Sequence, residues 1–258
     1  TMRKATREAK LHTSWMRIDE AYEQAVTSFV QRAVDNPEFR RELGALVDEC
    51  APYAAANGLA QVLLKLCSPG VADTYQGAEL WNTSLVDPDN RRDVDFGQRA
   101  RWLSLLRERT QEQPIVGGAQ RMGDVALASE LLERHADGLV KLYVTHLTLL
   151  LRRNLRTLFQ RGEYEPLVAG EHVVAFARSF ERSRVVVCAP RFSYKLTGGR
   201  APFACGDVWR NTSLALPGQG RYRNVFTGES HSLQSGGLRL SALMRHFPLA
   251  LLVQEESV

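Results

Sequence analysis

The stretch Ser68–Asp95 decides the fold of this chain: SPGVADTYQGAELWNTSLVDPDNRRDVD. Its Pro-Gly pair predicts a turn that ends an apolar helix, and Val71–Tyr75 follows as a short strand. Beyond Leu80 the apolar residues thin out, and acids, amides and arginines replace them. A polar loop that leaves a rigid element is typical of a functional site, but plain surface loops share this character, so the spacing alone marks only a candidate site.

Helical patterns surround this strand in the sequence. Asp19 is a candidate N-cap for a helix that ends at Asn36-Pro37, and Pro37 suits the first turn of another helix to about Cys50. We expect a stop or kink at Asn57-Gly58, a loop at 113–123, and further helices over residues 59–66, 96–109, 125–135 and 139–159. The nearly all-round apolar character of residues 59–66 indicates a buried helix.

The pattern changes near Arg161-Gly162. Short β-rich runs then alternate with Gly- and Pro-bearing turns, which predicts an all-β sandwich closed by the run 248–253. The strand at Val71–Tyr75 has no predicted partner before residue 160. Because a strand must pair its backbone with another strand, and because the chain begins on a charged helical run without a lead-in, we expect this sequence to be a fragment of a longer protein.

Composition narrows the classes of function. The 258 residues are 44% hydrophobic and 24% charged with a net charge of +4, which is typical of a globular protein. The arginines are scattered, so nucleic-acid binding ranks last among the readings, and we expect no nucleic-acid and no membrane partner. The cysteines have no Cys-x-x-Cys spacing and the histidines no metal-ligand spacing, which predicts a cytoplasmic protein with reduced thiols, no metal and no cofactor.

The central stretch also carries a resemblance. Pro69-Gly70-Val71, Tyr75-Gln76-Gly77 and Glu79-Leu80-Trp81 resemble the eighth-strand region of the α-amylase superfamily, glycoside hydrolase family 13. The longer pattern YQG-x-ELW…SLVDPDNRR-x-VD is narrower and resembles the maltooligosyltrehalose synthases. His12–Trp15, Leu142–Thr145 and Gly162–Leu167 also match, so the resemblance runs from near Thr1 to about Glu255. Three positions depart from the family pattern: Ala72, Thr74 and Asp93.

The resemblance implies a fold class of α/β plus all-β, namely the C-terminal part of a (β/α)8 barrel followed by an antiparallel β-sandwich. The implied domains are a helical insertion region at 1–57, the last barrel strand and helices at 58–160, and the β-sandwich at 161–258. The active site of such a barrel lies at the C-terminal ends of its strands. The missing N-terminal part of the barrel would hold the catalytic acids, so no residue of this chain is predicted to be catalytic.

The predicted substrate-binding residues carry groups that suit a sugar. Carboxylates accept hydrogen bonds from hydroxyls, an arginine donates to them or fixes the acids, and aromatic rings stack on a pyranose face. The set is His12, Trp15, Tyr75, Gln76, Glu79, Asp87, Asp89, Arg91 and Arg92.

Structural readings of the same residues stay open. Tyr75 could pack at the barrel mouth, and Glu79 could satisfy backbone amides or an arginine. The aspartates and arginines could merely stiffen their loop, and Trp15 or Trp81 could be a core or hinge anchor. Three aromatic residues of the β-rich part could form a glycan platform, although packing in the sandwich core or at a domain interface is the better prediction for them: Trp209, Tyr222 and Phe226.

The implied function is that of a segment of an enzyme that converts the reducing-end α-1,4 linkage of a maltooligosaccharide to an α,α-1,1 linkage. The alternatives are a free-standing carbohydrate-binding or regulatory module and a segment of a maltooligosyltrehalose trehalohydrolase. Partners expected from the resemblance are the maltooligosaccharide substrate and the missing part of the barrel.

Overall fold

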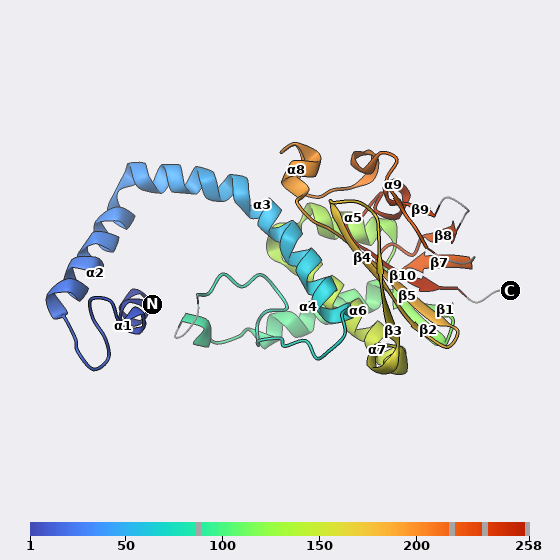
Figure 1. The fold of residues 1–258 in the computed structure, drawn as a ribbon, viewed down its shortest axis with the longest axis horizontal. Helices are drawn as coiled ribbons and strands as arrows, with labels where there is room; N and C mark the ends of the chain where they lie inside the picture. The colour runs from blue at the N-terminus through green and yellow to red at the C-terminus, as the bar shows by residue number, and fades with distance from the viewer. Residues whose placement is uncertain (86–88, 217–219, 234–236, 256–258) are drawn as a thin grey trace. The chain divides into compact units, whose positions relative to one another are not determined.

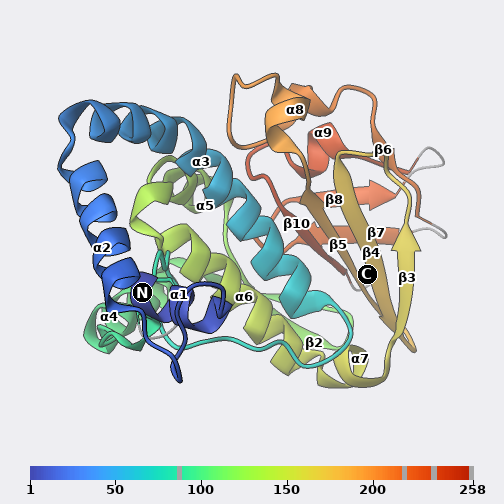
Figure 2. The same ribbon diagram turned by 60° about the vertical axis from the view of Figure 1, so that its left-hand side comes forward.

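The computed structural model describes residues 1–85, 89–216, 220–233 and 237–255 (Figures 1 and 2). The chain divides into two compact units. The helical unit comprises Thr1–Ala51 and Asn82–Val94, and the sheet unit comprises Pro52–Trp81 and Asp95–Val258. Each unit is described by itself.

The helical unit is built from α1 (Met2–Ala9), α2 (Glu20–Asp35), the first half of α3 (Pro37–Cys67) and the short helix η1 (Asp89–Arg91). The Asp19 carboxylate accepts a hydrogen bond from the Tyr22 amide, so the predicted N-cap of α2 is confirmed. Lys10 ends α1 with a φ of 58°, a left-handed conformation that turns the chain into the loop before α2.

The sheet unit contains a six-stranded antiparallel sheet in the order β3-β4-β5-β10-β7-β8. Its strands, in the order of the sequence, are β3 (Glu163–Leu167), β4 (Val173–Phe180), β5 (Ser183–Pro190), β7 (Gly220–Asn224), β8 (Ser230–Leu233) and β10 (Ala250–Gln254). Two small pairs accompany it: β1 (Gln111–Ile115) with β2 (Gly118–Met122), and β6 (Ser213–Leu214) with β9 (Leu238–Arg239). The helices of this unit are α4 (Phe96–Arg109), α5 (Val125–Glu133), η2 (His135–Asp137), α6 (Leu139–Asn154), α7 (Arg156–Arg161), α8 (Ser193–Thr197), η3 (Gly206–Trp209) and α9 (Leu240–Leu243).

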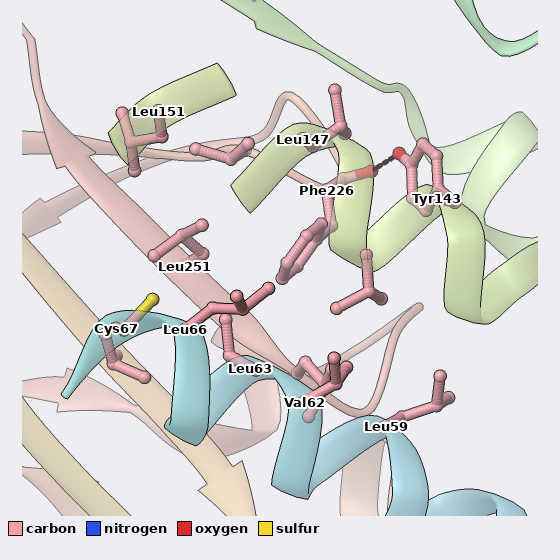
Figure 3. Packing of buried hydrophobic residues seen from close by; sticks show 14 of the residues in the cluster. Leu59, Val62, Leu63, Leu66, Cys67, Tyr143, Leu147, Leu151, Phe226 and Leu251 are labelled. Atoms are coloured by element: carbon pink, nitrogen blue, oxygen red, sulfur yellow. Dashed lines mark hydrogen bonds between the residues drawn. The ribbon is translucent and has the colours of Figure 1, made fainter. Parts of the chain in front are cut away.

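Both faces of the large sheet are buried. Successive strand side chains point to opposite faces, so Val187 and Leu251 enter one core while Val186 and Leu252 enter the other. Figure 3 shows the first core, in which Leu59, Val62, Leu63 and Leu66 of α3 pack with Leu251 and with residues of α6. The Tyr143 hydroxyl of α6 donates to the Phe226 carbonyl within this core.

The layer that covers the second face of the large sheet shows which part of the β-sandwich prediction is correct. The antiparallel strands are confirmed, but what covers this face is the short pair β6–β9 together with residues of η3 and α9, such as Trp209, Leu240 and Leu243. A second layer this short is not a full sheet. Trp209, Tyr222 and Phe226 are at most 2% exposed, so the core reading of these three aromatics is correct.

Three predicted elements are wrong. Val71–Tyr75 forms no strand, and Val71 is fully exposed, because no strand of the described residues pairs with it. The predicted loop at 113–123 is largely the β1–β2 hairpin, whose polar strands hid the pattern. Helix α3 continues through Asn57-Gly58 as one helix, since the buried apolar residues that follow hold it in place, so a stop at this point is wrong while a kink stays a prediction.

The predicted division of the chain at residue 161 falls inside one core. Residues of α3 and α6 share a hydrophobic cluster with residues of β4, β5 and β10. The three domains 1–57, 58–160 and 161–258 stay a prediction. All four cysteines are free, and burial raises the pKa of the Cys67 and Cys188 thiols to about 12. Among the described residues, no helix is long and apolar enough to cross a membrane.

Candidate functional site

The loop between α1 and α2 carries two of the predicted sugar-binding residues, His12 and Trp15. Both side chains are exposed, and Trp15 retains 54% of its accessible surface. The His12 ring packs against the Tyr22 ring with centroids 4.9 Å apart. The Arg7 guanidinium lies 5.0 Å from the centre of the Trp15 ring, a cation–π contact. Both rings therefore have one neighbour within the unit while remaining accessible to a ligand.

A buried ion pair lies beneath this loop. The Glu23 carboxylate accepts hydrogen bonds from Arg7 Nε at 2.7 Å, Arg7 Nη2 at 2.8 Å and Thr13 Oγ1 at 2.8 Å. The hydrogen bond from Arg7 is the main reason that the pKa of Glu23 falls to about 2, and the Thr13 hydroxyl contributes as well. The carboxylate is therefore ionised at neutral pH.

The loop around η1 holds an ion pair that stiffens it. The Asp89 carboxylate accepts a hydrogen bond from the Leu85 amide at 2.8 Å and from the Arg92 guanidinium. These two bonds, the amide first, lower the pKa of Asp89. The predicted network of aspartate and arginine is thus present for Asp89 and Arg92. Arg91, at the end of η1, is exposed and also has an interaction partner. Asp87 lies outside the described residues.

The sheet unit carries the other predicted residues. Tyr75 and Gln76 are exposed, and Tyr75 retains 47% of its surface. Glu79 accepts a hydrogen bond from Arg99 Nε at 3.0 Å, and the same guanidinium donates to the Gly77 carbonyl at 2.8 Å. Glu79 therefore fixes the Tyr75–Glu79 turn through Arg99, which is the structural reading of that residue. Tyr75 and Gln76 are the side chains that this turn leaves exposed.

A hollow of about 430 Å³ adjoins the turn. One wall is apolar and belongs to α3, and polar groups line the remainder. Burial, followed by the charge of Lys65, lowers the pKa of the Lys141 ammonium group at its edge. Lys65 Nζ donates to the Asp73 carbonyl at 2.9 Å and so fixes the segment that leads into the turn. The lining residues are Gly58, Gln61, Val62, Leu64, Lys65, Leu66, Thr74, Ala78, Glu79, Lys141 and Thr145.

Trp81 is an anchor of the sheet unit. Its indole Nε1 donates to the His135 carbonyl at 2.6 Å, and Lys141 Nζ lies 5.3 Å from its ring centre. The anchor reading that the sequence left open for this residue is therefore correct.

Some residues that hold the site were missed by the sequence analysis. Arg7, Glu23 and Arg99 act through contacts that are distant in sequence, and single charged residues in helical patterns look like an ordinary solvated face. A pattern that could have drawn attention to Glu23 is its position on the otherwise apolar stripe of α2, with Tyr22, Val26 and Val30. Within the described parts of the chain, no group of three or more His, Cys, Asp or Glu side chains could hold a metal ion.

Comparisons with known proteins match nearly the whole chain. No protein-family model matches it. A curated protein of Mycobacterium tuberculosis that bears the provisional name maltooligosyl trehalose synthase is 34% identical over 260 residues, which cover 98% of this chain and 28% of that protein. The solved maltooligosyltrehalose synthase of Arthrobacter ramosus is 32% identical with a TM-score of 0.72, over 97% of this chain and 29% of that one. Another solved maltooligosyl trehalose synthase is 27% identical with a TM-score of 0.67, over 98% of this chain and 29% of that one.

These three matches are to one class of protein, long enzyme chains of which this chain spans little more than a quarter. Those enzymes are maltooligosyltrehalose synthases, so the resemblance seen in the Tyr75–Asp95 motif and its flanks is confirmed along the chain.

Proposed function

We propose that this chain is the C-terminal segment of a maltooligosyltrehalose synthase, an isomerase of trehalose biosynthesis. The carrying observation is the alignment of 98% of the chain with a curated relative of that name at 34% identity. The predicted partners are the maltooligosaccharide substrate and the remainder of the enzyme's barrel. A cytoplasmic location stays a prediction.

The reaction is an intramolecular transglucosylation. In a retaining mechanism an enzyme carboxylate displaces the reducing-end glucose and forms a glycosyl ester, while an acid residue protonates the leaving oxygen. The released glucose stays bound and turns its anomeric hydroxyl toward the ester. That hydroxyl loses its proton to the same residue, attacks the ester carbon and frees the carboxylate. The catalytic acids belong to the part of the enzyme outside this chain.

Within this proposal, the segment retains the released glucose and excludes water. Tyr75 and Gln76 are exposed on a turn that Glu79 and Arg99 hold in shape. The adjoining hollow offers an apolar wall together with amide, hydroxyl and ammonium groups, which suits a sugar ring. On the helical unit, taken by itself, Trp15 offers a stacking face for a sugar ring, and Asp89 with Arg92 stiffens the loop that carries Arg91. Excluding water matters because water would hydrolyse the same ester.

The test uses the complete polypeptide that carries this segment, with maltopentaose as substrate. We expect a product that has lost its reducing end while its degree of polymerisation is unchanged. The Tyr75→Ala variant should release more free glucose relative to that product, since a poorly held glucose escapes before it attacks. Phe29→Ala is a matched control on an exposed aromatic of α2, and its ratio should stay that of the parent. Retention of all reducing ends by the parent enzyme would overturn the proposal.

The segment alone is predicted to be inactive. Incubation of the purified 258-residue chain with maltopentaose should leave the reducing-end concentration unchanged. Formation of a trehalosyl product by this chain would show that its own carboxylates complete the catalytic set.

A free-standing carbohydrate-binding module is a second candidate, and one observation favours it. The apolar face of α3 at Leu59–Leu66 is covered by the core of the sheet unit. A stable separate chain must cover this face without help from another polypeptide. Intact mass under native and denaturing conditions separates the readings, because a module has its own mass in both, whereas a nicked enzyme shows a second, larger polypeptide.

A further inference from the structure

The helical unit has an unusual interior. Among its described residues, only Thr13 and Glu23 are buried, with 3% and 7% of their surface exposed. Every apolar side chain of the unit within this range is half-buried or exposed. A buried carboxylate loses its hydration and contributes little net stability even when it is paired. We therefore explain the burial of Thr13 and Glu23 by the loop that they hold in place, and not by a contribution to the free energy of folding.

The two buried side chains connect the loop to both neighbouring helices. Glu23 on α2 binds the fork of Arg7 on α1 through two hydrogen bonds, at 2.7 and 2.8 Å. Its Oε1 atom also accepts the Thr13 hydroxyl hydrogen at 2.8 Å, and the Thr13 oxygen accepts the Asp19 amide hydrogen at 3.1 Å. The middle of the loop is thereby fixed to the end of the loop, to α1 and to α2.

This arrangement presents the Trp15 ring. Trp15 follows Thr13 by two residues, within a turn in which the Ser14 amide donates to the Arg17 carbonyl at 2.8 Å. The Arg7 guanidinium that binds Glu23 is also the group over the indole, at 5.0 Å. One side chain thus joins the buried carboxylate to the exposed ring. An exposed tryptophan held this way costs little further conformational entropy when a ligand stacks on it.

We propose that Glu23 is a positioning residue which, through Arg7 and Thr13, holds the Trp15 indole as a preformed stacking face for a glucose ring of the maltooligosaccharide. This inference rests on the proposed function. It adds three residues to that site that have no direct role in binding sugar: Arg7, Thr13 and Glu23.

The experiment uses the 258-residue chain with 5-fluorotryptophan incorporated, observed by fluorine NMR. The chain has four tryptophans, so the Trp15 resonance is assigned from a Trp15→Phe variant. Maltotetraose is titrated into the parent and into Thr13→Val, Thr13→Ser, Glu23→Gln and Glu20→Gln. Thr13→Val keeps the side-chain shape without the hydroxyl, Thr13→Ser keeps the hydroxyl, and Glu20→Gln makes the same charge change at an exposed residue of α2.

Without sugar, we expect Thr13→Val and Glu23→Gln to move or sharpen the Trp15 resonance alone, because the loop loses its attachment. The other three resonances report on the sheet unit and should not move. With maltotetraose, the same two variants should bind about tenfold more weakly, because a loop without this attachment would hold Trp15 in the binding-competent position only about a tenth of the time. Thr13→Ser and Glu20→Gln should keep the Trp15 resonance and the maltotetraose affinity of the parent. A general loss of structure on substitution would not spare these two variants.

The possible outcomes distinguish a failure of the positioning role of Glu23 from a failure of sugar binding at Trp15. An unchanged Trp15 resonance in both Thr13→Val and Glu23→Gln would overturn the positioning role, whether or not sugar binds. If the resonance changes as expected but maltotetraose never shifts it in the parent, the sugar contact of Trp15 is wrong. In that case the loop is still held by Glu23, and the stacking face that we propose is refuted.

Discussion

His146 on α6 shows at the residue scale how burial makes stability depend on pH. Its Nε2 atom is buried without a partner in the described structure. Burial first, and then the charges of Arg107, Arg121 and Arg153, together lower the pKa of the ring to about 4. Between pH 6.5 and 4 the unfolded chain therefore binds a proton that the folded chain does not, and the unfolding free energy falls as the pH falls through this window.

We predict that His146→Gln removes this contribution. Urea unfolding at pH 6.5 and 4.5 should show a drop in unfolding free energy that is about 1 kcal/mol smaller in the variant than in the parent, a modest value because the ring is partly exposed. His12→Gln, which changes an exposed histidine, is the control and should leave the drop as it is in the parent. Equal drops in His146→Gln and the parent would contradict the argument.

Arg178 on β4 shows how one side chain can donate hydrogen bonds to the C-terminal carbonyls of two helices. It is 2% exposed, and its guanidinium donates to the Phe159, Gly162 and Cys67 carbonyls at 3.1, 3.0 and 3.3 Å. The last carbonyls of α3 and α7 have no partner within their own helices, so Arg178 caps both. Burial is the main cause of its lowered pKa.

We predict that Arg178→Met lowers the unfolding free energy by about 3 kcal/mol, since the carbonyls that it served stay buried without a donor. The unfolding free energy of Arg178→Lys should lie between those of Arg178→Met and the parent, because an ammonium group cannot reach as many carbonyls as the guanidinium fork. Arg182→Met, at an exposed arginine of the β4–β5 turn, serves as the control for a lost charge. Denaturant unfolding curves provide the measurement, and similar values for Arg178→Met and Arg182→Met would refute the capping role.

At the scale of the element, α3 offers a matched pair of glycines. A Cβ atom at Gly58 would lie 3.0 Å from Trp81 Cζ3, whereas a Cβ atom at Gly44 meets nothing within 4 Å. Alanine favours a helix over glycine by about 1 kcal/mol. Gly44→Ala should therefore add helix at 222 nm and raise the midpoint of thermal unfolding.

Gly58→Ala should raise the midpoint of thermal unfolding less than Gly44→Ala does, or lower it. It should also change the fluorescence of Trp81, whose indole would have to move. The same thermal scans, with emission recorded in parallel, measure both effects. Equal stabilisation by the two substitutions would mean that Gly58 has no packing role.

The elements differ in how well the sequence predicts them, for physical reasons. The N-cap Asp19 and the alternating apolar runs of β4 and β5 are local signals, and they predict α2 and the antiparallel strands correctly. The β1–β2 hairpin has polar strands, and Pro114 disguises it further. The continuation of α3 through Asn57-Gly58 depends on the core beyond it.

In the candidate site too, local sequence signals predict some residues, while others depend on contacts between distant parts of the sequence. Exposed rim residues such as Trp15 and Tyr75 can be found from a motif, whereas the supporting contacts of Glu23 and Arg99 join residues that are 16 and 20 positions apart. Such pairs become visible only when the helices are placed in space.

At the scale of the whole molecule, the two units differ in what stabilises them. The sheet unit has two hydrophobic clusters on the two faces of one sheet. The described residues of the helical unit bury only Thr13 and Glu23. Because hydrophobic burial is the main favourable term in folding, the helical unit should open locally far more readily than the sheet unit.

Amide hydrogen exchange tests this difference, and α3 contains its own control because the boundary between the units falls within it at Ala51–Pro52. We predict that amides of β5, β10 and the Leu59–Cys67 half of α3 exchange on the order of 100-fold more slowly than amides of α2 and the Pro37–Ala51 half. The two halves belong to one helix and differ in burial, so we attribute the expected contrast to the buried contacts of the Leu59–Cys67 half. Equal protection in both halves would mean that the helical unit is stabilised by something other than burial within this chain. Slower exchange at α2 on addition of maltotetraose would instead connect its order to the sugar that Trp15 is proposed to bind.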